Sequence, residues 1–304
     1  MNDYEMKVGG ADGLSDYMLG EADRLRTLGR FRWAEAIVAT DRSLRRFARG
    51  SALDFDDLTP DLMRRYEAYL RGEGLARNTS SFYMRVARSV YNRAVTEGLV
   101  ADCRPFASVY TGIDRTSKRS LTLDEMRCLR RLDLVRQPRL EFARDVFFFS
   151  FYMRGMSFVD MAFLRKSDVR DGFVRYRRRK TSRLLTAEYV PQMQAVVERW
   201  PSATQYLLPI IEREDGSERE QYKARLVSIN RCLKLVGRLA GLRLPLTTYV
   251  SRHSWATIAR EAQVPLAVIS EALGHDSLLT TQIYLDSIGS AAVDRANRLV
   301  IEGL

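Results

Sequence analysis

The chain has 304 residues, which corresponds to about two ordinary domains. Lysine and arginine number 49 against 38 aspartate and glutamate residues, and the resulting net charge of +11 favours a polyanionic partner such as nucleic acid. The three widely spaced cysteines exclude a disulfide framework, and no segment has the pattern of a membrane span or a secretory signal, so we expect a cytoplasmic protein with no membrane partner.

Residues 15–105 are predicted to form a helical domain. One helix is expected at about 33–47, with an apolar face. A second begins at Thr59-Pro60-Asp61, where threonine caps the helix, proline occupies the first turn and aspartate follows. A third begins at Asn78 or Thr79, carries an apolar stripe at spacing four and ends at Gly98.

Positive charge gathers on the third of these helices and on the segment that follows the domain. Few acidic residues lie between positions 77 and 93, which favours a phosphate-facing surface over an ordinary solvated helix face. Residues 106–120 are polar, basic and aperiodic, and we interpret them as a linker that can lie along DNA. The DNA contacts predicted here are Arg77, Arg85, Arg88, Arg115 and Lys118.

Residues 121–304 are predicted to form a second domain, which opens with a capping box of Thr122 and Glu125. Residues 141–163 indicate one long apolar helix or two joined helices. A β-hairpin follows, with alternation from Phe173, a basic turn and a second strand over 184–190. Arg178 and Arg179 lie at this turn and are predicted to contact DNA. The fold class is therefore mainly α, with two domains and a small hairpin or sheet in the second.

The segment from 247 onwards carries the most informative pattern. Arg252 lies at the start of a predicted helix, Gly274 ends the next one, and His275 follows directly. A last helix, capped by Ser277, carries Tyr284 about two turns on. Each of these residues has an ordinary explanation on its own, as a salt-bridge partner, a helix cap or a core tyrosine. Their order, however, allows a compact helical packing to bring Arg252, His275 and Tyr284 into one cleft.

Three sequence blocks in this segment resemble the C-terminal signature of the tyrosine recombinases of the phage-integrase family. They are R-H-S-W-A-T at 252–257, L-G-H-D-S at 273–277 and T-T-Q-I-Y at 280–284, in the family's order and spacing. Residues 74–79 also look like the family's helical core-binding domain, and residues 151–161 resemble a Bacteroidetes branch of integrases. The resemblance implies a site-specific DNA recombinase whose two domains clamp duplex DNA.

The resemblance also implies a role for each residue, and the chemistry fits the residue types. Tyr284 would attack the scissile phosphate, which forms a 3′-phosphotyrosine and frees a 5′-hydroxyl. Arg252 would hold the phosphate with its planar fork, and His275 would donate a hydrogen bond to it. Lys180, in the hairpin turn, would protonate the leaving 5′ oxygen. No metal and no other cofactor is expected, because arginines supply the charge stabilisation.

Two positions depart from the family pattern. Ser157 stands where the family has its first arginine, within a G-x-R-x-x-E block, and Tyr249 stands where it has a histidine. We predict that Arg154 supplies the missing guanidinium from a neighbouring helical turn, unless it only forms a salt bridge, and Arg144 is the second candidate. Tyr249 is expected either to hydrogen-bond the phosphate or the nucleophile, or only to pack.

The resemblance further implies a homotetramer on paired sites of double-stranded DNA. It leaves open the oligomeric state of the protein without DNA, for which a monomer is one alternative. The same chemistry serves integration, excision or inversion, so a mobile element and a phase-variation switch both stay open, as does the DNA site. Residues 286–304 are expected to form a tail helix that docks on a neighbour or on its own domain. The alternatives are a catalytically silent DNA-binding protein derived from a recombinase and a topoisomerase-like enzyme that acts on one duplex.

Overall fold

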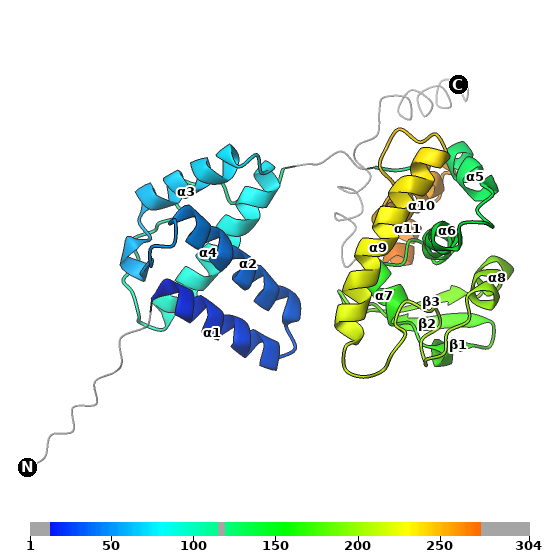
Figure 1. Cartoon of the computed structure of the whole chain (residues 1–304), viewed down its shortest axis with the longest axis horizontal. Helices are drawn as coiled ribbons and strands as arrows, with labels where there is room; N and C mark the ends of the chain where they lie inside the picture. The colour runs from blue at the N-terminus through cyan, green and yellow to red at the C-terminus, as the bar shows by residue number, and fades with distance from the viewer. Residues whose placement is uncertain (1–12, 115–118, 275–304) are drawn as a thin grey trace, which may run out of the picture. The chain divides into compact units, whose positions relative to one another are not determined.

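The computed structural model describes residues 13–114 and 119–274, and it divides the chain into two compact units, Met1–Thr116 and Ser117–Leu304 (Figure 1). Helices dominate both units, and the described strands form one small sheet in the second. The predicted fold class, mainly helical with two domains, is therefore confirmed. Across the described ranges, no helix is both long enough and apolar enough to cross a membrane.

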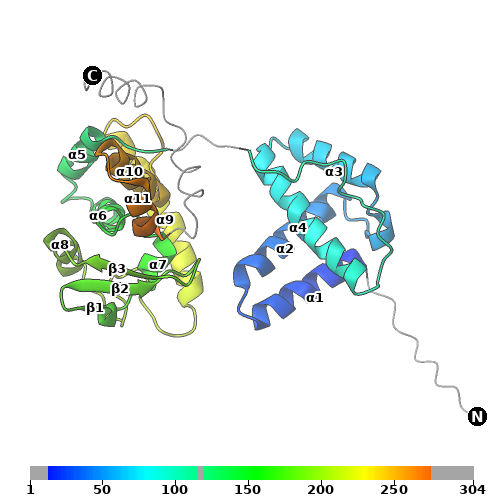
Figure 2. The ribbon, with the colours of Figure 1, turned by 180° about the vertical axis from the view of Figure 1, so that it is seen from behind.

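The first unit is a small helical bundle, seen from two sides in Figures 1 and 2. Its elements are α1 (Leu14–Thr27), α2 (Phe31–Phe47), the short 3₁₀ helix η1 (Phe55–Asp57), α3 (Pro60–Gly72) and α4 (Arg77–Thr96). The helices bury one apolar face each around Met63, Tyr66 and Tyr91. The backbone N–H of Leu62 donates to Thr59 Oγ1 at 3.2 Å, so the predicted start of α3 is confirmed.

The expected linker begins later in the chain than the sequence indicated. Phe106 and Val109 are buried in the core of the first unit. Asp114 is bound to the start of α4 by a reciprocal pair, in which Asn78 Nδ2 donates to its carbonyl at 2.9 Å and its own N–H donates to Asn78 Oδ1 at 2.7 Å. Residues 106–114 therefore belong to the first unit. They are held by the buried side chains of Phe106 and Val109 and by hydrogen bonds between side chains and backbone, which leave no periodic pattern in the sequence.

The second unit is built around one buried helix. Its elements are α5 (Leu123–Arg131), α6 (Pro138–Tyr152), α7 (Phe158–Ala162), η2 (Lys166–Asp168), β1 (Val169–Arg170), β2 (Phe173–Arg177), β3 (Leu184–Glu188), α8 (Pro191–Arg199), α9 (Glu218–Leu239), α10 (Thr248–Glu261) and α11 (Leu266–Leu273). Helix α6 packs against α8, α9 and α10, and Phe147 and Phe149 on it are fully buried. The apolar run from 141 to 163 is thus two helices, joined by a turn.

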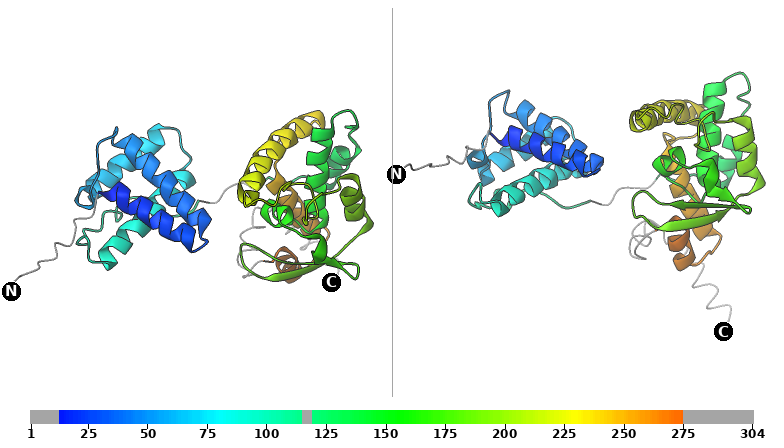
Figure 3. Two further views of the ribbon diagram at one scale, coloured as in Figure 1. Left: turned by 60° about the horizontal axis from the view of Figure 1, so that its bottom comes forward. Right: turned by 90° about the horizontal axis from the view of Figure 1, so that it is seen from below.

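The sheet of the second unit has the strand order β1-β2-β3, and all neighbours are antiparallel. The strands are labelled in Figure 2, and Figure 3 shows the same ribbon from two further sides. The predicted hairpin is β2–β3, and β1 adds a short edge strand. The turn between β2 and β3 is closed by two backbone bonds, from Arg178 N to Arg183 O at 2.8 Å and from Ser182 N to Arg178 O at 2.7 Å. Lys180 lies between these two closures.

Two local predictions at helix ends are also confirmed. Thr122 and Glu125 form the capping box at the start of α5, with each side chain accepting from the other residue's backbone N–H. Gly274 ends α11 in the left-handed conformation, with φ of 62°, which glycine adopts without a steric penalty. The chain therefore leaves α11 at the residue immediately before His275.

Candidate functional site

The turn between α6 and α7 places backbone directly against Arg252. Arg154 and Gly155 both have left-handed backbone, with φ of 56° and 76°. A Cβ atom at Gly155 would lie 2.6 Å from the Cα of Arg252, so only glycine fits this contact. Helix α6 ends at Tyr152 and α7 begins at Phe158, so Arg154 and Ser157 do not share a helix. The prediction that the two lie on neighbouring helical turns is wrong.

Arg252 joins three parts of the second unit through its guanidinium group. Its side chain, on α10, is buried, with 4% of the residue exposed. Nη1 donates to the carbonyl of Gly155 at 2.9 Å, and Nη2 donates to the carbonyl of Leu273, at the end of α11, at 2.6 Å. Both acceptors are neutral. These bonds therefore fix the plane of the guanidinium.

The hairpin is bound to the end of α11 by a second buried arginine. Arg178, only 8% exposed, donates from Nη1 to the carbonyl of Gly274 at 2.5 Å. Gly274 also packs closely on the hairpin, because a Cβ atom there would lie 2.9 Å from the side chain of Leu185. The hairpin thus holds the last described residue before His275.

The turn that carries Lys180 is anchored by Asp160. The buried carboxylate of Asp160 accepts from the backbone N–H of Arg179 at 2.8 Å and from Ser157 Oγ at 2.6 Å. Ser157 Oγ in turn caps α7 at the Asp160 N–H, and the Arg179 guanidinium lies 3.8 Å from the centre of the Phe163 ring. Lys180 itself is exposed. Ser157 therefore holds the acid that positions the neighbour of Lys180.

Tyr176, on β2, lies among these charged groups and was not singled out from the sequence. Burial raises its pKa, and Asp160 raises it further, whereas Arg252, Arg178 and Arg154 lower it. Three guanidinium groups and one carboxylate therefore act on the pKa of this phenol. The alternation of the strand could have indicated its position, since residues 174, 176 and 178 point to the same, inner face.

Arg154 and Tyr249 occupy the edges of this arrangement. Arg154 is half-buried, and its Nη1 donates to the carbonyl of Thr186 on β3 at 3.3 Å. Tyr249, on α10, is 53% exposed, and its ring meets the His253 ring edge to face, with centroids 4.7 Å apart. The exposure of Tyr249 argues against a pure packing role, and its two expected hydrogen-bonding roles stay predictions.

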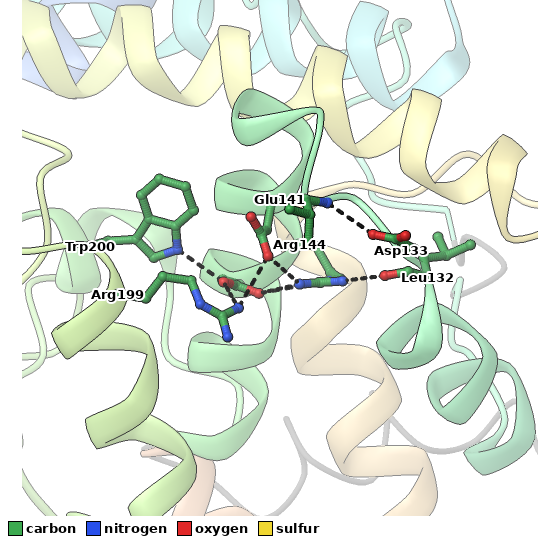
Figure 4. A network of polar contacts seen from close by, with 8 residues as sticks. Leu132, Asp133, Glu141, Arg144, Arg199 and Trp200 are labelled. Carbon is green, nitrogen blue, oxygen red and sulfur yellow. Dashed lines mark hydrogen bonds and ion pairs between the residues drawn. The ribbon is translucent and has the colours of Figure 1, made fainter.

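Arg144, the second candidate for the missing arginine, belongs to a separate ion cluster (Figure 4). Its Nη2 lies 3.1 Å from Asp145 Oδ1 and 3.3 Å from Glu141 Oε1. Its Nη1 donates to the carbonyl of Leu132, the residue that follows α5. Arg199 and Trp200 also donate to Asp145. Because two carboxylates already face Arg144, its charge is matched within the protein.

The predicted DNA contacts of the first unit lie along α4. The Arg77 guanidinium lies 3.8 Å from the centre of the Tyr110 ring and 3.4 Å from an Asp114 oxygen. Arg88 Nη1 donates to Thr111 at 3.2 Å. Arg85 donates to its own helix. All three stay predictions as DNA contacts. Four further predicted residues lie outside the described ranges 13–114 and 119–274, namely Arg115, Lys118, His275 and Tyr284.

Comparison with known proteins matches both units. Residues 14–107 match the phage integrase SAM-like domain, and residues 144–289 match the phage integrase family. Tyrosine recombinase XerA of Thermococcus onnurineus is 28% identical over 256 residues, covering 76% of this chain and 86% of XerA.

Two solved structures share the fold at low sequence identity. A lambda integrase dimer bound to a COC′ core site superposes with a TM-score of 0.66 at 14% identity, over 89% of this chain and 76% of that one. A lambda integrase tetramer bound to a Holliday junction gives a TM-score of 0.64 at 15% identity, over 88% and 76%. These likenesses support the architecture of the chain.

Replacing Arg144 by alanine is expected to destabilise the second unit rather than to alter chemistry. The change leaves the buried Asp145 and the partly buried Glu141 with one cation fewer, which costs about 3 to 5 kcal/mol of unfolding free energy. Arg139→Ala, an exposed arginine on the same helix, serves as the control and should change stability by less than about 0.5 kcal/mol. Denaturant unfolding measures both, and equal stabilities would contradict the structural role of the cluster.

Proposed function

Because this chain belongs to the phage integrase family of tyrosine recombinases, we propose that it is a site-specific DNA recombinase that cuts and rejoins strands through a phosphotyrosine bond. The observation that carries the proposal is the buried guanidinium group of Arg252 at the end of α11. Arg252 is buried there with neutral carbonyl acceptors, and the hairpin that bears Lys180 is bound to the same helix end. Buried positive charge of this kind favours a phosphate ligand.

The scissile phosphate would bind against Arg252. Gly155 and Leu273 hold the guanidinium from two sides, so it need not reorganise as charge develops on the phosphate. His275 follows Gly274 directly in the chain and would donate a hydrogen bond to the same phosphate. Preorganised donors of this kind stabilise the transition state more than the ground state.

The chemistry then proceeds as two transfers at one phosphorus atom. The Tyr284 oxygen, which loses its proton, attacks phosphorus as the bond from phosphorus to the 5′ oxygen breaks, and Lys180 gives a proton to that leaving oxygen. The products are a 3′-phosphotyrosine and a 5′-hydroxyl. A 5′-hydroxyl from another strand reverses the step and releases Tyr284. The ester conserves the bond energy, so no nucleotide cofactor is consumed.

The sequence offers two arginines for the second cation that binds the phosphate, in place of the family's first arginine. Of the two arginines proposed for the position that Ser157 leaves vacant, Arg154 lies among the charges around Tyr176. Arg144 is matched by Glu141 and Asp145 elsewhere. Arg154 is therefore the stronger of these two candidates. Ser157 holds Asp160, so its presence does not favour a catalytically silent protein.

The partner is double-stranded DNA, and a homotetramer on paired sites suits strand exchange between two duplexes, which requires four active sites. The lambda integrase structures include a dimer on a core site and a tetramer on a Holliday junction. Integration, excision and inversion use the same chemistry, and a mobile element or a phase-variation switch remains the expected setting. A DNA substrate also favours the cytoplasmic location that the sequence predicts.

Tyr284→Phe should abolish covalent capture of DNA, because it removes only the attacking oxygen. The substrate is randomly nicked genomic DNA from the source organism, since a nick beside the cleavage point lets the short strand diffuse away and traps the adduct. Adducts that survive denaturing gels are counted, and their DNA is sequenced to define the site. Tyr189→Phe, on the same unit, is the control and should capture DNA normally. An adduct from Tyr284→Phe would transfer the role to another tyrosine.

Lys180→Ala should slow cleavage of ordinary DNA by about a hundredfold or more, because the leaving 5′ oxygen lacks its acid. A duplex of the captured sequence with sulfur at the bridging 5′ position needs no proton on its leaving group, so it should be cleaved at nearly the unmodified protein's rate. Arg170→Ala, an exposed cation of the same sheet, controls for loss of charge. If both substrates slow equally, Lys180 only binds DNA.

A further inference from the structure

Three arginines are buried within the described part of the chain, and they differ in what balances their charge. They are Arg144, Arg178 and Arg252. Arg144 faces two carboxylates. The side chain of Arg178 instead donates to the carbonyl of Gly274, and no carboxylate among the described residues lies within ion-pair distance of it. A neutral donor would serve that carbonyl equally well, so the buried charge of Arg178 suits an anionic ligand.

Arg178 lies beside Arg252. The two guanidinium groups donate to the carbonyls of Gly274 and Leu273, which are consecutive residues, so their centres lie within about 10 Å of each other. Both also act on the phenol of Tyr176, on which burial has the larger effect. Two like charges held this close together in a buried site favour a ligand with negative charge on more than one oxygen.

The hairpin fixes Arg178 in this position. Its backbone closes the turn at both ends, donating to Arg183 O and accepting from Ser182 N. Its side chain lies on the inner face of the hairpin, in line with Val174 and Tyr176. A Cβ atom at Gly274 would lie 3.4 Å from Arg178 Cδ, so the stem of the side chain is packed as well. The guanidinium is thus preorganised.

Arg154 is less well placed for this role. It is half-buried, and its guanidinium donates to Thr186 O on the outer strand of the hairpin. Its left-handed backbone leads into Gly155, which seats the turn on Arg252. Arg154 therefore contributes to the site through the turn, and its side chain lies at the edge.

We propose that Arg178 is the second guanidinium that contacts the scissile phosphate, and that it replaces the arginine missing at Ser157. The inference rests on the proposed recombinase function and deepens it. Arg252 and Arg178 would share the charge that develops on the non-bridging oxygens, while no bond to Arg178 forms or breaks. Ser157 is then free to hold Asp160, which anchors the turn next to Arg178.

The test compares two substrates built on the captured DNA sequence. One carries the normal scissile phosphate, and the other carries a methylphosphonate, in which a methyl group replaces one charged oxygen. Arg178→Gln keeps a donor for the Gly274 carbonyl but loses the charge. It should cut the normal substrate about a hundredfold or more slowly and the neutral substrate within about threefold of the unmodified protein.

Three further variants complete the test. Arg178→Ala should show the same cleavage rates as Arg178→Gln on the two substrates, and thermal melting shows whether each variant is folded. Arg154→Ala should cut the normal substrate within about tenfold of the unmodified protein. Arg175→Ala, an exposed arginine on the same strand, should match the unmodified protein on both substrates.

The outcomes separate the inference from the function on which it rests. If the unmodified protein captures no DNA, the proposed function fails. Suppose instead that the unmodified protein captures DNA. If Arg178→Gln then cleaves the normal substrate at the rate of the unmodified protein, or is slowed by the same factor on both substrates, the inference alone is overturned and Arg178 only holds Gly274. If Arg154→Ala is instead slow and recovers on the neutral substrate, the role belongs to Arg154.

Discussion

The last carbonyl groups of α11 have no partner within their own helix, and two arginines from distant parts of the chain donate to them. Arg252 binds the carbonyl of Leu273, and Arg178 binds that of Gly274. A helix of eight residues is marginal by itself, and these two bonds bind its end to the rest of the unit. They also determine where the chain departs towards His275.

The rest of the second unit supports this contact. Gly155 lets the α6–α7 turn approach Arg252 closely enough for its carbonyl to accept a hydrogen bond. Asp160 binds the backbone of the hairpin turn, which keeps Arg178 and Lys180 in register with α11. The charge of Arg144 is neutralised by Glu141 and Asp145, in an ion cluster that is separate from the site around Arg252. Among the described residues, Arg252 and Arg178 therefore both lie buried at the end of α11.

Local chemistry in the sequence predicted much of this arrangement, and tertiary contacts decided the rest. The caps at Thr59 and Thr122 and the stop at Gly274 were predictable because each is a property of a few neighbouring residues. The position of Arg154 was not, because the turn that follows Tyr152 packs against Arg252 on α10, a residue far away in the sequence.

The choice among arginines is likewise a tertiary property. Nothing in the spacing shows that Arg144 meets two carboxylates while Arg178 meets none within residues 13–114 and 119–274. The same holds for residues 106–114, which dock on α4 through backbone groups.

The central claim is that buried arginines hold a phosphate for attack by Tyr284. The most direct measurement is mass spectrometry of the captured adduct after nuclease and trypsin digestion. Residues 261–295 form one tryptic peptide whose single tyrosine is Tyr284. The account predicts that this peptide carries a nucleotide joined through its 3′ phosphate. A nucleotide on any other peptide, or a 5′ linkage on this one, would contradict it.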